Sequence, residues 1–169
     1  MRKKREKKKN KGPEKEFSFN LRLADVHDIL PMTLMWSKMV EESGGGYDKI
    51  DKEELDKFSY AMMDRLRIPN VFTNLGEVDG RIVGFIHAYI QNKPYGKPSQ
   101  VAFCECLYVD KKYRGKGLND ALAESYIAWS WEQGSKISLE MMTRYDIKLV
   151  KVWAKKHNFF PYNIVFRRD

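Results

Sequence analysis

The sequence predicts an α/β fold, in which a mixed β-sheet is flanked by helices. Two periodicities support this prediction, because some segments alternate apolar and polar residues as strands do and others repeat apolar residues at helical spacing. Glycine-containing turns separate these segments. In chain order the elements read β-α-α-β-β-β-α-β-α-β, and the 169 residues suffice for one domain with one core.

The N-terminal part of the fold is predicted to be a strand followed by two helices. The strand covers residues 17–23, where apolar side chains alternate with polar ones. The first helix begins at about Asp28 and is ended by the three glycines at residues 44–46. A second helix follows, because Asp51 and Glu54 have the spacing of a capping box, in which each side chain accepts the other's backbone N–H.

A β-hairpin is predicted in the middle of the chain. Residues 71–78 and 81–90 have strand character, and the Asp79-Gly80 pair between them is typical of a two-residue turn. A further strand is predicted over residues 101–109, after a loop that contains two prolines.

The C-terminal part is predicted to alternate helices and strands. A helix begins after Gly117 and ends at Gly134, and a strand covers residues 137–142. We expect Asp146 to cap the last helix and residues 162–166 to form the closing strand.

Basic residues are concentrated at the N-terminus. Residues 1–15 hold nine Lys and Arg against two Glu, so this segment carries almost all of the net charge of +8. We expect residues 1–15 to be a disordered basic arm and residues 16–169 to be one domain. Two interpretations of the arm stay open: a solvated tail, or an arm that docks through residues 2–15 on nucleic acid or another polyanion.

The composition indicates a soluble protein that contains no metal. No apolar run approaches the roughly 18–20 residues of a membrane span, and no apolar segment of a signal peptide follows the basic start. We therefore expect a cytoplasmic location and no membrane partner. Cys104 and Cys106 are expected to lie on one face of a strand and to pack in the core. No residues have the spacing of a metal site, so no metal is expected.

The strongest functional signal is a strand that runs into a basic glycine turn and then directly into a helix. Residues 112–117 of this turn read Lys-Tyr-Arg-Gly-Lys-Gly. Backbone N–H groups, a helix N-terminus and several cations meet there, which suits a pyrophosphate. The glycine spacing excludes a P-loop, and Asp120 stands where a dinucleotide-binding fingerprint requires its third glycine.

This turn, together with the strand before it, resembles the acetyl-CoA signature of the general-control-type N-acetyltransferases, the GNAT superfamily. The signature reads Gln/Arg-x-x-Gly-x-Gly/Ala, and Lys112 takes its first place. The resemblance implies a GNAT-like fold with a mixed, mostly antiparallel sheet. It also implies an enzyme that transfers an acetyl group from acetyl-CoA to a primary amine by direct attack in a ternary complex.

The resemblance assigns two groups of residues to the coenzyme. The backbone of the strand end would pair with the pantetheine arm, and the turn with the helix start would hold the diphosphate. These residues are Leu107, Tyr108, Val109, Lys112, Tyr113, Arg114, Gly115, Lys116, Gly117 and Leu118.

Glu105 is the candidate general base. An ionised carboxylate is costly in the middle of a strand unless it is paired, and this favours its taking up a proton from the acceptor amine. Its position before the glycine motif resembles that of the catalytic glutamate in polyamine-type GNAT acetyltransferases. The alternative is a carboxylate at the strand edge that pairs with a nearby Lys or Arg.

The sequence departs from the family at the general acid. Family members typically carry a tyrosine in the last helix that protonates the thiolate, and Ala154 occupies that position. Ile147 replaces the asparagine that often opens the same helix. Tyr145 and Tyr162 are candidate substitutes, and water is another. The alternative function is therefore a GNAT-fold protein without turnover, a binding or assembly module that the basic arm anchors.

Overall fold

The computed structural model describes residues 17–43, 50–92, 100–134, 136–139 and 147–160. Its strands are β1 (Asn20–Leu23), β2 (Val71–Val78), β3 (Arg81–Asn92), β4 (Gln100–Val109) and β5 (Lys136–Leu139). Its helices are α1 (Ile29–Ser43), α2 (Lys52–Arg65), α3 (Leu118–Glu132) and α4 (Ile147–Lys156), with short 3₁₀ turns η1 (Val26–Asp28) and η2 (Lys111–Tyr113).

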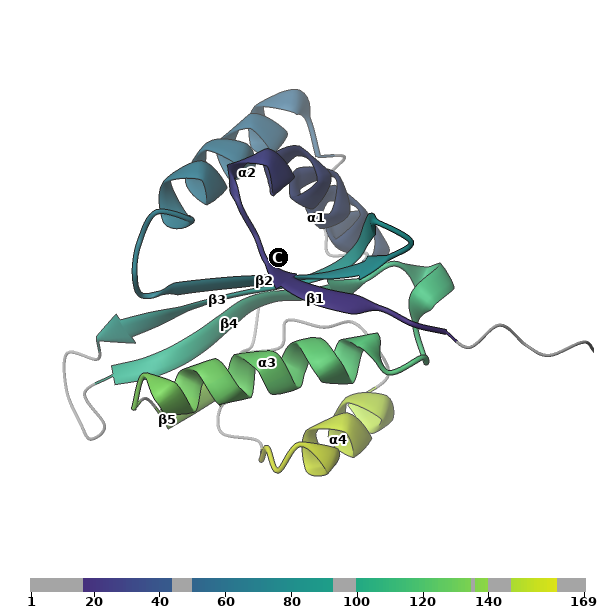
Figure 1. Cartoon of the computed structure of the whole chain (residues 1–169), viewed down its shortest axis with the longest axis vertical. Coiled ribbons are helices and arrows are strands. Elements are labelled where there is room, and N and C mark those ends of the chain that lie inside the picture. The colour runs from purple at the N-terminus through teal and green to yellow at the C-terminus, as the bar shows by residue number, and fades with distance from the viewer. Residues whose placement is uncertain (1–16, 44–49, 93–99, 135, 140–146, 161–169) are drawn as a thin grey trace, which may run out of the picture.

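The described strands form one sheet in the order β1-β2-β3-β4-β5. Neighbours from β1 to β4 are antiparallel, and β5 joins β4 in parallel. Helices α1 and α2 cover one face of the sheet, while α3 and α4 lie on the other face (Figure 1). The predicted α/β class and the order of the described elements are therefore confirmed.

Some expectations lie outside the described residues. These are the basic arm over residues 1–15, the cap at Asp146 and the closing strand over residues 162–166. They stay predictions.

The hairpin and the second helix form as their local sequences require. Asp79 and Gly80 have φ values of 50° and 72°, and two successive left-handed residues are the backbone of the expected two-residue turn between β2 and β3. At the start of α2, Asp51 accepts the Glu54 N–H at 2.9 Å, and Glu54 accepts the Asp51 N–H at 3.3 Å. The predicted capping box is therefore confirmed.

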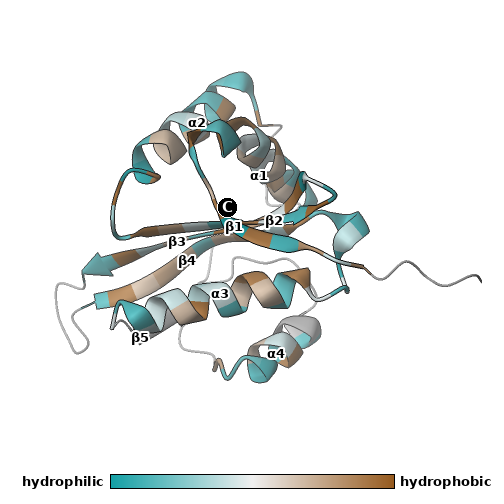
Figure 2. Cartoon of the chain, viewed as in Figure 1, coloured by the Kyte–Doolittle hydropathy of each residue, from teal (hydrophilic) through white to brown (hydrophobic). Residues whose placement is uncertain are grey.

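Two apolar cores lie on opposite faces of the sheet. The core beneath α3 includes Ile86, Leu122 and Tyr126, whereas the core beneath α1 and α2 includes Met32 and Phe85. Figure 2 shows the strands largely hydrophobic between the two layers and the outer side of α2 hydrophilic. Each face of the sheet is thus fixed by its own layer of helices, and β4 contributes side chains to both.

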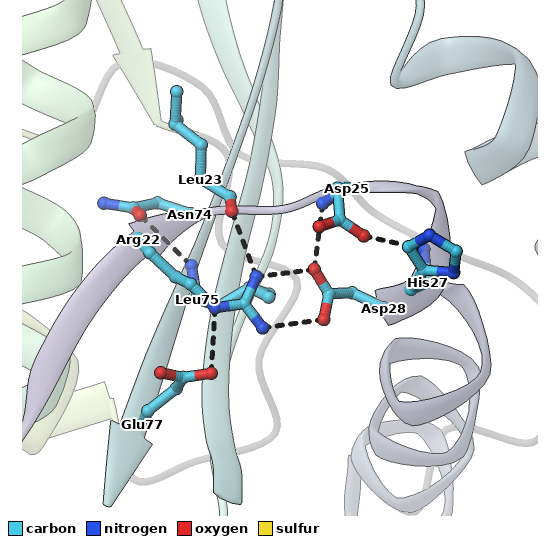
Figure 3. Close-up of polar contacts among 8 residues, drawn as sticks. All are labelled: Arg22, Leu23, Asp25, His27, Asp28, Asn74, Leu75 and Glu77. Carbon is cyan, nitrogen blue, oxygen red and sulfur yellow. Dashed lines mark hydrogen bonds and ion pairs between the residues drawn. The ribbon is translucent and has the colours of Figure 1, made fainter. Parts of the chain in front are cut away.

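A charged cluster fixes the entry of α1 (Figure 3). Arg22 on β1 donates to both carboxylate oxygens of Asp28, at 2.6 and 2.8 Å, and its Nε donates to Glu77 on β2 at 2.8 Å. Asp28 is buried and also accepts the backbone N–H of Asp25 at 2.9 Å. Because Asp28 directly precedes α1, these bonds hold the start of that helix against β1 and β2.

Substituting Asp28→Asn should lower the free energy of unfolding by about 2 kcal/mol at pH 7, because Arg22 loses a charged and largely buried partner. The hydrogen bond from Arg22 holds the pKa of Asp28 below its ordinary value. The stabilisation is therefore complete above about pH 4 and is lost as the pH falls through the lowered pKa. Urea unfolding between pH 2 and pH 7 measures both effects.

The matched control is Asp56→Asn, at an exposed position of α2. We expect this control to change stability by less than about 0.5 kcal/mol and to keep the acid-induced loss of the wild type. Equal stabilities and equal pH profiles for the two variants would contradict the role assigned to Asp28.

Candidate active site

β4 carries one residue more than the stretch of β3 opposite it. Cys106 pairs with His87 and Cys104 pairs with Ala88, so Glu105 is the extra residue of a β-bulge. The bulge shifts the alternation of side chains: Cys104 packs in the core beneath α3, and Cys106 packs in the core beneath α1 and α2. Both thiols are buried and free, as expected, but the prediction that they share one face is wrong.

β4 and β5 are paired over a short length. Their parallel register joins Val101–Cys104 to Lys136–Leu139. From Cys106 to Val109, β4 pairs only with β3 among the residues that the structure describes. Within that part of the chain, the other edge of β4 offers backbone N–H and C=O groups with which an extended ligand can pair, except for the Val109 carbonyl, which accepts a hydrogen bond from Arg114.

The turn after β4 places α3 at the same end of the sheet. Gly115 and Gly117 have φ values of 73° and 88°, and a Cβ on either would meet no atom within 4 Å. The left-handed backbone, rather than crowding, therefore selects glycine at both positions. Leu118, the first residue of α3, is fully buried and lies so close to Gly76 of β2 that a Cβ there would clash with it. This contact fixes where α3 begins.

The N-terminus of α3 has no capping side chain. Its N-cap is Gly117, which has no side chain that could accept a hydrogen bond from the N–H groups of the first turn. These N–H groups have no partner within their own helix, and the helix dipole adds partial positive charge around them. A helix start of this kind, preceded by two left-handed glycines, is suited to binding an anion.

The cationic side chains of the turn are not equivalent. Lys112 is exposed, and within the described residues it forms no ion pair. The ammonium of Lys116 lies over the rings of Phe17 and Tyr113, at 4.7 and 5.7 Å from their centroids. The side chain of Arg114 turns towards α1 instead of the start of α3.

Glu42, in the last turn of α1, receives that guanidinium. Arg114 donates to Glu42 at 2.6 Å and to the carbonyl of Val109 at 2.6 Å, and the Tyr108 hydroxyl donates to Glu42 at 3.0 Å. Burial alone would raise the pKa of Glu42, but the hydrogen bonds from Arg114 and Tyr108 outweigh it and hold that pKa below its ordinary value. Glu42 therefore stays ionised and ties α1 to the end of β4 and to the turn. A phosphate contact by Arg114 requires this side chain to leave Glu42.

Glu105 is paired with Arg65, the last residue of α2. Each of the two side chains is 36% exposed. The pairing with an arginine that the alternative interpretation expected is therefore present, and the role of Glu105 as general base stays a prediction. The bulge explains this arrangement, because it takes Glu105 out of the β3–β4 ladder and lets its side chain reach α2.

A buried histidine completes this cluster. His87 on β3 lies 3.7 Å from Glu105 and 3.5 Å from Arg65 through Nε2, and its Nδ1 is hydrogen-bonded to Thr73 Oγ1 at 2.8 Å. Burial, together with the charge of Arg65, lowers the pKa of His87 to about 4. His87 is therefore neutral at physiological pH, and the charges of Arg65 and Glu105 balance each other.

Helix α4 is held against the first turns of α3 by charged groups. His157 lies 2.6 Å from a carboxylate oxygen of Glu124 and 3.0 Å from one of Asp120, and Lys156 also pairs with Asp120. Burial alone would raise the pKa of Asp120, but the hydrogen bonds from Lys156 and His157 outweigh it and lower that pKa. His157 is thus a structural bridge between α3 and α4.

The structure leaves the general acid open. Ala154 lies on α4, so the helix has a methyl side chain where the family typically has a tyrosine. Tyr145 and Tyr162 fall outside the described residues, and their role stays a prediction. Within the described ranges, no three His, Cys, Asp or Glu residues are grouped to hold a metal ion. No described helix is long and apolar enough to cross a membrane.

Comparison with known proteins defines the class. The model of the acetyltransferase (GNAT) family matches residues 35–159, and the chain therefore belongs to this family. Its members are acyltransferases, and the matched residues include the bulged strand β4, the glycine turn and α3. A search of curated proteins finds no significant sequence match.

Solved structures share the fold. A predicted acetyltransferase of Clostridium acetobutylicum, crystallised with acetyl-CoA, has a TM-score of 0.75 at 15% identity, over 90% of this chain and 96% of that one. Glucosamine-6-phosphate N-acetyltransferase of Arabidopsis thaliana has 0.67 at 17%, over 90% and 98%. An acetyltransferase of Trypanosoma brucei has 0.66 at 22%, over 90% and 99%.

Sequence reasoning missed two residues of the site. Glu42 precedes a run of glycines, and Arg65 ends a helix, so each looks like an ordinary exposed charge. Their roles become visible only in the folded structure, where Glu42 contacts Tyr108 and Arg65 contacts Glu105. His87 carried a signal, because a histidine within an apolar strand is unusual, but nothing in the sequence placed it beside Glu105.

Substituting Glu42→Gln should lower the free energy of unfolding by about 1–2 kcal/mol, because Arg114 keeps a neutral partner in place of a charged one. The control is Glu41→Gln, at the exposed neighbouring position, which should stay within about 0.5 kcal/mol of the wild type. Urea unfolding at pH 7 measures the difference. If the two variants were equally stable, Glu42 would not hold the turn.

Proposed function

We propose that this protein is an N-acetyltransferase that transfers the acetyl group of acetyl-CoA to a primary amine by direct attack in a ternary complex. The observation that carries the proposal is the start of α3. This helix start has no capping side chain and follows two left-handed glycines. It comes after the end of β4, which extends beyond the residues that pair with β5. Family membership supports the coenzyme, and the position of Glu105 on the same strand supports the chemistry.

The described residues fit the coenzyme. The first-turn N–H groups of α3, the backbone around Gly115 and Gly117, and the exposed Lys112 would hold the diphosphate. The edge of β4 from Leu107 to Val109 would pair with the pantetheine arm as a further strand does. Acetyl-CoA supplies the activated acyl carbon, and the protein supplies its orientation.

Glu105 would act as the general base. The acceptor arrives as an ammonium, and its proton passes to the Glu105 carboxylate, so that the nitrogen has a free electron pair. The N–C bond then forms as the C–S bond breaks, the nitrogen of the new amide loses its second proton, and the leaving thiolate takes up one proton, so that the net proton released is the one that Glu105 accepted. Tyr145, Tyr162 or a water molecule would supply the proton that the thiolate takes up. Because Glu105 forms an ion pair with Arg65 in the structure, the Arg65 guanidinium must move away from the carboxylate when the ammonium binds.

Two further features of the proposal concern the whole chain. We place the enzyme in the cytoplasm as part of this proposal. The basic residues 2–15 would bring it to nucleic acid or another polyanion, and such binding would weaken steeply with salt.

Substituting Glu105→Gln should lower kcat for acetyl transfer by at least about a hundredfold, because the amide cannot accept the proton of the ammonium. The measurement is release of free CoA with a panel of primary amines. The increase in melting temperature that we expect from acetyl-CoA should persist in the variant, since Glu105 is not among the residues proposed to hold the diphosphate.

Glu132→Gln, at the exposed end of α3, is the control and should keep the wild-type kcat. An unchanged kcat in Glu105→Gln would remove Glu105 as the base. A protein whose melting temperature did not respond to acetyl-CoA would contradict the proposed function as a whole.

A further inference from the structure

The ion pair between Arg65 and Glu105 bears on which amine the site accepts. Arg65 ends α2, and Glu105 stands at the bulge of β4, so the two charges come from the two elements that meet at this edge of the site. Both side chains are partly exposed, which lets a ligand reach either of them. The guanidinium also lies over the ring of Tyr89, 5.4 Å from its centroid, which holds it in place from one side.

The charges of this cluster are balanced before a substrate binds. Arg65 contributes one positive charge and Glu105 one negative charge, while His87 is neutral because its pKa is lowered to about 4. Among the described residues, Glu105 is the one carboxylate that pairs with Arg65. The positive charge of the Arg65 guanidinium is therefore neutralised by Glu105.

An acceptor amine disturbs this balance. It arrives as a cation and must contact Glu105 to lose its proton, so it competes with Arg65 for the same carboxylate. Two unit charges about 4 Å apart near a protein surface repel each other by about 4 kcal/mol. An acceptor with an amine as its only charged group leaves the site with one uncompensated positive charge, whereas a negative group on the acceptor would cancel that charge.

We propose that the acceptor carries a carboxylate as well as its amine, and that Arg65 binds this carboxylate and so releases Glu105 to act as the base. The inference rests on the proposed function and narrows its acceptor to amino acids or other amino carboxylates. The planar guanidinium matches a carboxylate with two parallel hydrogen bonds. One negative charge restores the balance of the site, which favours a carboxylate over a phosphate dianion. Arg65 is thus a specificity-determining residue.

Matched acceptor pairs test the proposal. Each pair shares one amine and differs only in a carboxylate or its primary amide: glycyl-alanine, 4-aminobutyrate and 6-aminohexanoate, each against its amide. In the wild type, kcat/KM should favour the carboxylate member of the preferred pair by about tenfold or more, the worth of one charged hydrogen-bonded contact. In Arg65→Gln this ratio should fall to about one. Arg67→Gln, at an exposed position two residues further on, should keep the wild-type ratio.

A second readout separates this inference from the proposed function. Calorimetric binding of the same six compounds to the CoA-loaded protein needs no turnover, and it should show the same preference and the same loss in Arg65→Gln. Turnover or binding that is equal for acids and amides in the wild type would overturn the inference and leave the proposed function intact. A preference that survives in Arg65→Gln would overturn the role of Arg65. If no amine were acetylated, the proposed function would fail, and the binding preference alone would decide the inference.

Discussion

β4 carries one more residue than the stretch of β3 with which it pairs, and the candidate site depends on that extra residue. Because Glu105 leaves the β3–β4 ladder, Cys104 and Cys106 enter opposite cores, and the strand is held from both layers of helices. Beyond the bulge, the described part of β4 continues without β5 as a neighbour. One local irregularity thus accounts for both the projecting carboxylate and the packing of β4 against both cores.

The two halves of the site are joined through charged groups at the ends of helices. Glu42 at the end of α1 orients Arg114 and Tyr108, and so connects the layer over one face of the sheet to the turn that starts α3. Arg65 at the end of α2 does the same for Glu105. The helices α1 and α2 are therefore more than a cover for the sheet. Their last turns hold two charged side chains of the site, Arg114 and Glu105, in contacts within the protein.

Much of the fold could be predicted from the sequence, because its signals are local. The capping box at Asp51, the Asp79-Gly80 turn and the glycines before α3 each act on their own backbone, and the structure has each of them as expected. The bulge at Glu105 could not be predicted, since it depends on how β4 pairs with β3, and the alternation of residues gives no sign of it. The same reason hid Arg65, which is distant in sequence and adjacent only after folding.

The proposed function depends above all on binding of the coenzyme by the edge of β4 and the start of α3. Amide hydrogen exchange with and without CoA tests it most directly, because bound N–H groups exchange more slowly. We expect protection on CoA addition in peptides that cover residues 107–120, with the largest effect at Gly115–Asp120. Protection confined to other segments, such as the β2–β3 hairpin, with unchanged exchange over residues 107–120, would contradict the account.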